Sequence, residues 1–397
     1  MKKLNATILF IVFLQIVNAQ GPEITSWVLN TTGATGYNNI PSNVQDVSYT
    51  TTDVYISASC IPGYSIGPWM GNPNIPVNKN FVYKITRSPQ KNTGTLVATG
   101  LGHTGVWSNG VSIFNSDDGM SYNNQNIWNR NAYFWEGASF DNCLGHPAPN
   151  GEYHHHVSPK CLYDVTDSTH HSPIIGYSFD GFPVYGAYGY TDTNGTGPIK
   201  RMRSSFVLLS ATTRTNGPVV NSTYPLGCFI EDYSYQAGYG DLDDHNGRFC
   251  VTPDYPLGIY AYFVTIDDTL APVYPFTPGP TYYGTIPAGN MGPNGGHNII
   301  PSNATVYTGS SGINELSGGI KFEISPNPVS DFTFIYFDQS STEKTKGEIY
   351  NALGGLLETI DNIQNNGSYK LDFTKYPTGN YFILLSTEKN KAFHKIL

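Results

Sequence analysis

Four histidines lie in one short stretch of the chain, HPAPNGEYHHH, which runs from His146 to His156. In an extended segment the side chains alternate between two faces, so His154 and His156 share one face. Tyr153 and His155 then share the other. Two imidazoles on one face can bind one metal ion, and the intervening Pro-Asn-Gly turn allows His146 to fold back as a third ligand. Because neutral imidazole keeps a lone pair at neutral pH, this spacing predicts a metal site.

The ligand types favour copper or zinc, since imidazoles without an obligatory carboxylate suit both ions. A second pair, His170-His171, follows the first stretch. Adjacent residues of an extended strand face opposite ways, so only one of the two can reach a shared ion, and we include His171 as a candidate ligand. The alternative for all these histidines is a structural one, in which buried, hydrogen-bonded imidazoles hold a loop-rich core together.

Three further residues are candidates for groups that support a metal-bound imidazole: Tyr153, Asp141 and Asp180. Tyr153 flanks the histidines directly. Asp180 precedes Gly181, so a turn explains it, and a carboxylate partner for a liganding imidazole is the sharper alternative.

An aspartate-rich segment, DLDDHNGR, begins at Asp241 and has a loose likeness to a calcium-binding loop. The twelfth position of such a loop needs a glutamate, and here it is Thr252, so we expect a tight turn rather than calcium. The chain has no Gly-x-Ser-x-Gly and no His-Glu-x-x-His sequence, which argues against a nucleophile elbow and the common zinc-protease signature.

The start of the chain has the pattern of a secretory signal. Met1-Lys2-Lys3 is basic, residues 8–14 are apolar, and the small residues up to Ala19 suit cleavage after that position. The apolar run is shorter than the ~20 residues that span a bilayer, and we expect no transmembrane segment.

Export makes disulfides the expected state of the five cysteines. Cys143 and Cys161 bracket the histidine stretch, while Cys228 and Cys250 bracket the aspartate-rich segment, so we predict these two pairs. Cys60 is left without a partner.

Composition predicts a mainly β protein with long loops. Charged residues are only 13% of the chain and aromatics 14%, with 29 tyrosines and 42 glycines. We predict strands at 46–56, 81–87 and 255–266, and two strands joined by a turn at Asn109-Gly110 over 100–114. We also predict a hairpin over 174–190 and one short helix over 123–136. The net charge of −9 argues against nucleic-acid binding.

A Ser/Gly-rich linker over 303–320 separates the main domain, residues 20–302, from a segment of different character. Short strand patterns over 321–397 predict a small immunoglobulin-like β-sandwich. The ordered motifs SPNP at 325–328, NALG at 351–354, LDF at 371–373 and PTGNY at 377–381 resemble the C-terminal sorting domain of type IX secretion cargo. The resemblance implies the type IX machinery of a Gram-negative bacterium as partner, with removal of the domain and lipopolysaccharide anchoring or release.

Residues 100–263 resemble the YHYH family of exported proteins. The matching segments are DNCLGHP at 141–147, GEYHHH at 151–156, PIIGYSFDGFPVYG at 173–186 and LDDHNGR at 242–248. This chain has His155 where the family name has its second tyrosine, but His154 and His156 keep their register. The resemblance indicates a fold and a site and leaves the reaction open.

The sequence therefore predicts a secreted or surface-exposed protein that binds copper or zinc, and leaves open whether it is an enzyme. Two alternatives remain. One is a glycan-binding module, in which exposed tyrosines and four of the five tryptophans, Trp69, Trp107, Trp128 and Trp135, stack on sugars. The other is a purely structural surface protein.

Overall fold

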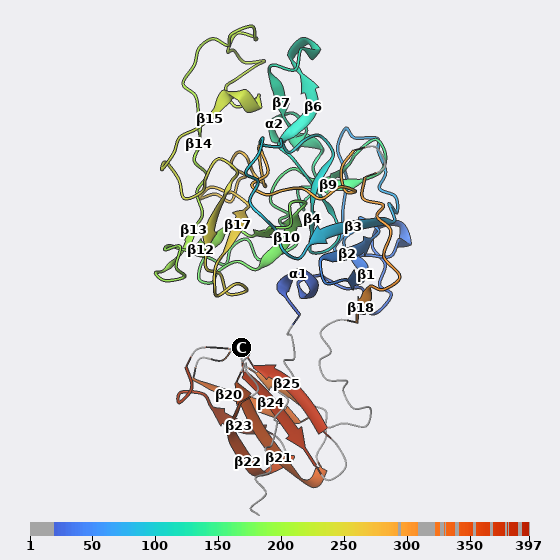
Figure 1. Ribbon diagram of the computed structural model, residues 1–397, viewed down its shortest axis with the longest axis vertical. Coiled ribbons are helices and arrows are strands. Elements are labelled where there is room, and N and C mark those ends of the chain that lie inside the picture. The colour runs from blue at the N-terminus through green and yellow to red at the C-terminus, as the bar shows by residue number, and fades with distance from the viewer. Residues whose placement is uncertain are drawn as a thin grey trace, which may run out of the picture. The chain divides into compact units, whose positions relative to one another are not determined.

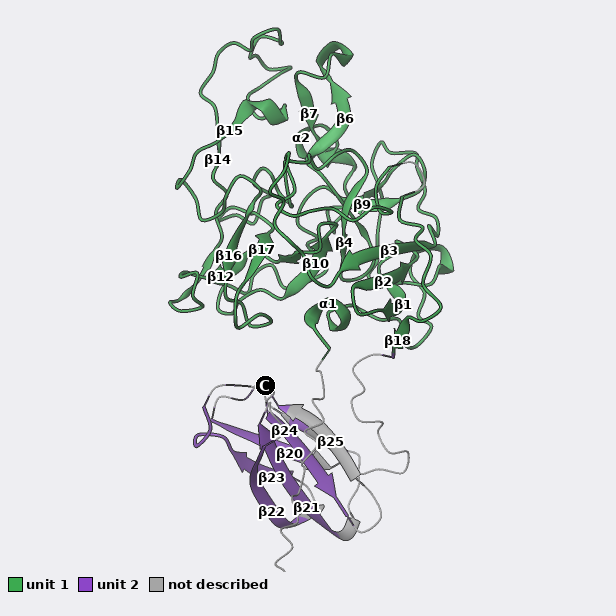
Figure 2. Cartoon of the chain, in the orientation of Figure 1, with its two compact units in different colours: residues 1–307 green, residues 308–397 purple. Residues whose placement is uncertain are grey.

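The computed structural model describes residues 20–292 and 295–308 and, further on, 322–325, 329, 331–337, 341–351, 355–365, 368–377, 379, 381–387 and 391–396. The chain forms two compact units, residues 1–307 and 308–397 (Figure 2). The predicted signal sequence and most of the predicted linker lie outside the described residues. No helix in the described part of the chain is long and apolar enough to cross a membrane.

The first unit is built around an eight-stranded sheet, which Figure 1 shows among long loops. Its strands, in spatial order, are β16 (Gly247–Cys250), β17 (Ile259–Phe263), β11 (Pro183–Tyr185), β10 (Ile174–Ser178), β4 (His103–Trp107), β5 (Ser112–Phe114), β9 (Tyr153–His155) and β8 (His146–Pro147). The β5–β9 and β11–β17 pairs are parallel, and the other neighbours are antiparallel. The histidine stretch therefore forms one edge of this sheet.

A second sheet of four antiparallel strands packs into the same unit. Its order is β18 (Thr305–Tyr307), β1 (Val44–Tyr49), β2 (Asp53–Ala58) and β3 (Phe81–Thr86). Because Val47 of β1 pairs with Tyr307, the main unit extends into the segment predicted as linker. Val47 and Tyr83 of this sheet share one hydrophobic cluster with Tyr177 of the larger sheet, so the two sheets have a common core.

Short elements connect the strands of these sheets. Two-stranded ribbons are formed by β6 (Asp117–Ser121) with β7 (Asn129–Asn131), β12 (Tyr188–Tyr190) with β13 (Ile199–Arg201), and β14 (Phe206–Leu208) with β15 (Tyr233–Tyr235). The α-helical turns are α1 (Pro22–Thr25) and α2 (Ala132–Trp135), and the 3₁₀ turns are η1 (Tyr37–Asn39), η2 (Tyr122–Asn124), η3 (Gly137–Ser139) and η4 (Ile230–Asp232).

The helix predicted over 123–136 is reduced to the single turn α2. Asn123, Asn124 and Asn126 have φ values of 53–55°, in the left-handed region that a right-handed helix excludes. The chain then forms β7, and only after Asn131, whose side chain accepts a hydrogen bond from the backbone N–H of Tyr133, does one helical turn follow. Local asparagine conformations therefore override the helical pattern.

The abundant tyrosines serve the core. Tyr83, Tyr153, Tyr177, Tyr185, Tyr262 and Tyr282 are fully buried, and so is Trp107. Their hydroxyls find partners inside the fold, as when Tyr262 donates to Asp180 over 2.6 Å. The glycan-binding alternative relied on exposed tyrosines and on Trp107, and these buried rings give it no support.

The second unit is a small immunoglobulin-like β-sandwich. One sheet has the order β19 (Phe322–Ser325), β20 (Phe332–Phe337), β23 (Ser368–Asp372), and the other β22 (Leu356–Asn365), β21 (Ser341–Asn351), β24 (Tyr381–Ser386), β25 (Lys391–Ile396). Ile335 of the first sheet and Ile349 and Ile383 of the second pack into one buried cluster. The predicted fold class is thus confirmed. Residues 326–328, 352–354, 378 and 380 of the quoted motifs lie outside the described residues.

Candidate metal centre

The turn between β8 and β9 brings the histidines together. Ala148 N–H donates to Glu152 O over 2.9 Å and Gly151 N–H to Ala148 O over 2.8 Å, which closes the Pro-Asn-Gly segment into a tight turn. Gly151 takes a φ of 77°, a conformation that glycine adopts without strain. His146 consequently pairs directly with His154 across the ladder.

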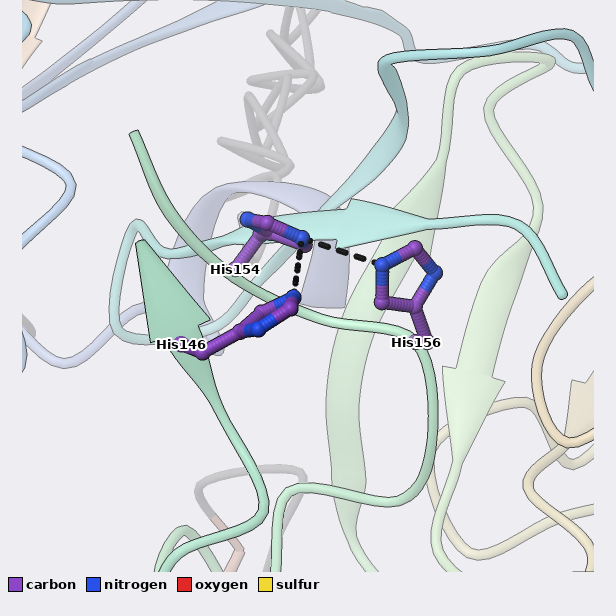
Figure 3. A group of neighbouring side chains, drawn as sticks. All are labelled: His146, His154 and His156. Atoms are coloured by element: carbon purple, nitrogen blue, oxygen red, sulfur yellow. Dashed lines mark hydrogen bonds between the residues drawn. The ribbon is translucent and has the colours of Figure 1, made fainter. Parts of the chain in front are cut away.

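The three imidazoles point their Nε2 atoms at one another, as Figure 3 shows. The Nε2 atom of His154 is 3.1 Å from that of His146 and 3.0 Å from that of His156. The three residues are only 2–4% exposed. Among the described residues, they are the one group of His, Cys, Asp or Glu side chains that lies close enough to share an ion.

The opposite ring nitrogens fix the tautomer of each imidazole. Nδ1 of His154 lies 3.0 Å from the carbonyl of Glu152, and Nδ1 of His156 lies 2.6 Å from the carbonyl of Asn115. A carbonyl only accepts, so each Nδ1 carries a proton and donates it. These two rings therefore present the lone pair of Nε2 to the centre.

The tautomer of His146 is fixed in a similar way, by the hydroxyl of Ser139. Its Nδ1 is 2.7 Å from Ser139 Oγ, and that hydroxyl donates its own proton to the carbonyl of Glu136 over 2.8 Å. In this arrangement Ser139 accepts from His146 Nδ1, and the third Nε2 then has a free lone pair.

The lone pair of His154 Nε2 lies 3.0–3.1 Å from those of His146 and His156, and such lone pairs repel one another unless something positive lies between them. A proton on His154 Nε2 can bridge one of its two contacts, and a lone pair there can accept one, but neither satisfies both. A cation at the shared point would satisfy all three nitrogens at once. The arrangement is thus chemically suited to a metal ion.

Burial favours the neutral form of His146 and His154. It lowers the pKa of His146 to about 4, with the charge of His156 adding to the effect. Burial likewise holds the pKa of His154 well below its ordinary value, with His156 and His146 contributing. Neutral imidazole is the metal-binding form, so the site is ready for an ion at neutral pH.

One residue of the site was missed by the sequence analysis, and it is Glu136. Its Oε2 lies 3.2 Å from His156 Nε2 and 3.7 Å from His146 Nε2. Burial alone would raise the pKa of this carboxyl, but the hydrogen bond and charge of His156, with smaller effects from His146 and Arg130, lower it. Glu136 ends α2, the turn that the sequence had placed in a longer helix, so no local signal pointed to it.

The histidine cluster opens onto a cavity of about 540 Å³. Its lining includes the three histidines, the acidic residues Asp117, Asp118 and Glu136, and the aromatic residues Phe114 and Trp135. No lysine or arginine is among the lining residues. The volume falls in the range of small-molecule sites.

Asp141 and Tyr153 support the loop rather than touch the imidazoles. Asp141 Oδ2 accepts from the Tyr153 hydroxyl over 2.9 Å, while its Oδ1 accepts from the backbone of Cys143 and Gly145. This carboxylate therefore anchors the segment that leads into His146. His155 points to the other face, against Trp107 and Tyr153, as alternation required.

His171 and Asp180 lie elsewhere in the unit. His171 donates from Nδ1 to the carbonyl of Ser172 over 2.7 Å and packs against the ring of Tyr185, so it does not join the three histidines. Asp180 is fully buried and accepts from Tyr262 and the backbone of Gly284. Its role is that of a core turn, the simpler of the two interpretations.

The aspartate-rich segment forms a turn. Asp243 accepts from the backbone of His245 and Gly247 and from the hydroxyl of Tyr260, whereas Asp241 pairs with Lys200 over 2.6 Å. The two carboxylates therefore serve separate local contacts.

One predicted disulfide is present and the other is wrong. Cys143 and Cys161 are bonded, with an S–S distance of 2.06 Å. Cys228 and Cys250 are free and buried, as is Cys60. Cys228 lies beside the Arg214 guanidinium, and Cys250 belongs to β16 at the edge of the large sheet. Bracketing a motif in sequence did not bring these two sulfurs together.

Two family models match this chain. Residues 82–274 match the model described as YHYH protein, and residues 323–397 match the secretion system C-terminal sorting domain. Residues 82–274 are a YHYH domain. The three histidines and Glu136 lie inside the YHYH domain, as does most of the cavity lining, and residues 70–74 of that lining precede the domain. The sorting domain marks the protein for secretion or the outer surface.

No curated protein matches the chain. Among solved structures, a DUF3244 family protein with an immunoglobulin-like β-sandwich fold, from Bacteroides vulgatus ATCC 8482, is 10% identical. That match has a TM-score of 0.16 and covers 20% of this chain and 96% of that chain.

Proposed function

We propose that the YHYH domain of this protein binds a transition-metal ion through the Nε2 atoms of His146, His154 and His156. The observation that carries the proposal is the meeting of three buried Nε2 atoms in rings whose Nδ1 atoms each contact an oxygen on the opposite side. A structural role for these histidines would need each ring nitrogen to find a donor or an acceptor, and the shared contact at His154 leaves one ring unsatisfied.

Copper and zinc are the proposed ions. With metal–nitrogen bonds of about 2.05 Å, the two nitrogen pairs of His154, which are 3.0–3.1 Å apart, subtend about 95° at the ion. A tetrahedral zinc site would separate them by about 3.3–3.4 Å. Angles near 90° suit the tetragonal coordination of Cu²⁺.

The cavity gives this ion a route to a substrate. An ion at the shared point would face about 540 Å³ of open space, so a coordination position can be left to water or to an incoming ligand. Such an open position is what separates catalytic sites from closed structural ones. Metal-assisted hydrolysis or oxygen chemistry are the reaction classes that fit it.

The protein is also proposed to act outside the cell. The sorting domain supports passage through type IX secretion machinery. We propose that this follows cleavage of the signal near Ala19, and that removal of residues 321–397 leaves the YHYH domain anchored to lipopolysaccharide or released. N-terminal sequencing of protein recovered from the cell surface tests the cleavage: a start at Met1 would contradict it.

Metal analysis of the purified chain tests the ligand set. After metal-replete expression we expect one equivalent of copper or zinc in the wild type and none in a His154→Ala/His156→Ala double variant. His170→Ala is the matched control, because its exposed side chain lies outside the site. A wild-type protein without metal, or a double variant that still binds the metal, would contradict the proposal.

A further inference from the structure

We propose that Glu136 is the fourth ligand of this metal centre and the one on its substrate side. The inference rests on the proposed function and deepens it, because it turns three nitrogens into a site of three nitrogens and one oxygen.

The distances place the carboxylate where a ligand would be. Glu136 Oε2 lies 3.2 Å from His156 Nε2 and 3.7 Å from His146 Nε2. Two ligand atoms that are each about 2.1 Å from one ion lie at most about 4.2 Å apart. Separations of 3.2 and 3.7 Å therefore correspond to angles of about 100° and 120° at the ion. Glu136 lies outside the group of ligand atoms that are all within 4.8 Å of one another, so its carboxylate must move towards the imidazoles to coordinate.

The negative charge of Glu136 lies against the imidazoles. His156 and His146 are its ion-pair partners when they are protonated, and no lysine or arginine of the described chain pairs with it. The Arg130 guanidinium contributes to the lowered pKa of Glu136, but it forms its ion pair with Asp118 over 2.8 Å and stacks on Trp135 at 4.2 Å. A divalent cation at the shared point would be attracted by the carboxylate and by the three nitrogens together.

The backbone of Glu136 serves the same site as its side chain. Its N–H donates to Ala132 O over 2.8 Å, which closes α2. Its carbonyl accepts from the Ser139 hydroxyl, which in turn holds the tautomer of His146. The side chain of Glu136 thus points its carboxylate at the imidazoles, and its backbone carbonyl helps Ser139 to fix the tautomer of His146. This double contact is more than a chance surface approach would give.

Exposure distinguishes Glu136 from the histidines. Its side chain is 30% exposed and lines the cavity, whereas the side chains of His146 and His156 are 5% and 3% exposed. An incoming substrate therefore meets the ion on the Glu136 side. Three neutral imidazoles and one carboxylate leave a divalent ion with a single positive charge, which suits a neutral or anionic donor atom on the substrate.

The test compares Glu136→Gln with Asp117→Asn in the full mature chain. Both variants remove one negative charge from the wall of the same cavity, but only Glu136 lies against the imidazoles. Competition titrations with copper alone and zinc alone, and the electron paramagnetic resonance spectrum of the copper form, are the readouts. Thermal melts without metal check the fold, and Glu136→Asp, which keeps a carboxylate, serves as the second variant.

We expect Glu136→Gln to lose at least about tenfold in metal affinity and to change the copper spectrum, and Asp117→Asn to stay within about threefold. Glu136→Asp should recover part of the loss. Equal affinity and an unchanged spectrum in Glu136→Gln would overturn the inference while leaving the three-histidine site intact. An equal loss of affinity in both variants would also overturn the inference, because it would show that the negative charge of the cavity, and not coordination by Glu136, attracts the metal. If the wild type binds no metal, the proposed function itself fails.

Discussion

Asp141 and Tyr153 are joined by a buried hydrogen bond of 2.9 Å that fixes the loop before His146 to the strand that carries His154. The same carboxylate accepts the backbone N–H groups of Cys143 and Gly145. Because both residues are buried, the bond is shielded from water. This hydrogen bond therefore helps to hold β8 in register with β9, and so helps to bring the imidazoles of His146 and His154 together.

Replacing Tyr153 with phenylalanine should therefore lower stability without emptying the metal site. A hydrogen bond to a charged group contributes about 1.5–3 kcal/mol, and we expect a loss of about 2 kcal/mol in the free energy of unfolding by urea. Tyr235→Phe is the control, since that ring is 38% exposed, and it should change stability by less than about 0.5 kcal/mol. Equal effects in the two variants would contradict the role given to Asp141.

Ser139→Ala should weaken metal binding through the tautomer of His146. Without the hydroxyl, Nδ1 loses its acceptor and the proton can move to Nε2, where it blocks the lone pair. Loss of such an outer partner typically costs 10–100-fold in metal affinity. Isothermal titration with copper measures the change, and Ser139→Thr, which keeps a hydroxyl, should recover most of it. An alanine variant with wild-type affinity would show that the tautomer is held in another way.

The metal-free protein should become less stable as the solution is acidified. Burial lowers the pKa of His146 from 6.5 to about 4, so the unfolded chain takes up a proton that the folded chain resists. The stabilisation is fully present above pH 6.5 and is lost as the pH falls towards 4. With about 1.4 kcal/mol per pKa unit, the loss attributable to His146 approaches about 3 kcal/mol.

Urea unfolding at pH 7, 6 and 5 measures this slope, and His146→Asn should flatten it. Bound metal should raise stability at pH 7 and lose that effect on acidification, because protons compete for the same lone pairs. A slope that is identical in the wild type and in His146→Asn would assign the acid sensitivity to other groups.

Thiol counting tests the cysteine assignment. The denatured, unreduced protein should expose three reactive thiols, those of Cys60, Cys228 and Cys250, and reduction should add two. A single thiol before reduction would restore the pairing of Cys228 with Cys250 that the structure contradicts.

The Cys143–Cys161 bond should matter for stability because it closes the loop that holds all three histidines. For a sequence separation of 18, chain entropy predicts a stabilisation of about 3 kcal/mol. We expect a Cys143→Ser/Cys161→Ser variant to lose about that much in urea and to bind copper more weakly. A Cys60→Ser variant controls for the loss of a buried sulfur. A double variant with wild-type stability would show that the loop is held by other contacts.

Much of the site follows from local chemistry. Alternation along an extended strand separates His154 and His156 from His155, and the Pro-Asn-Gly turn folds His146 back beside them. Those rules act over a few residues, so they could be applied before any fold was known. The mainly β class and the sorting domain followed in the same way, from composition and from ordered motifs.

Long-range contacts decided the rest. His171 was excluded because Tyr185 and Ser172 surround it, and Cys228 and Cys250 because they belong to different parts of the unit. The helix expected over 123–136 shrank to one turn because asparagines with positive φ interrupt it.

The sequence by itself determined which histidines share a face, because strand alternation is a property of the backbone. Only the tertiary structure decided that Glu136 meets them, that Asn115 and Ser139 fix the tautomers of two of them, and that the cluster opens on a cavity. The reason is physical. These groups come from segments with no regular spacing to the histidines, so their meeting depends on how the whole core packs.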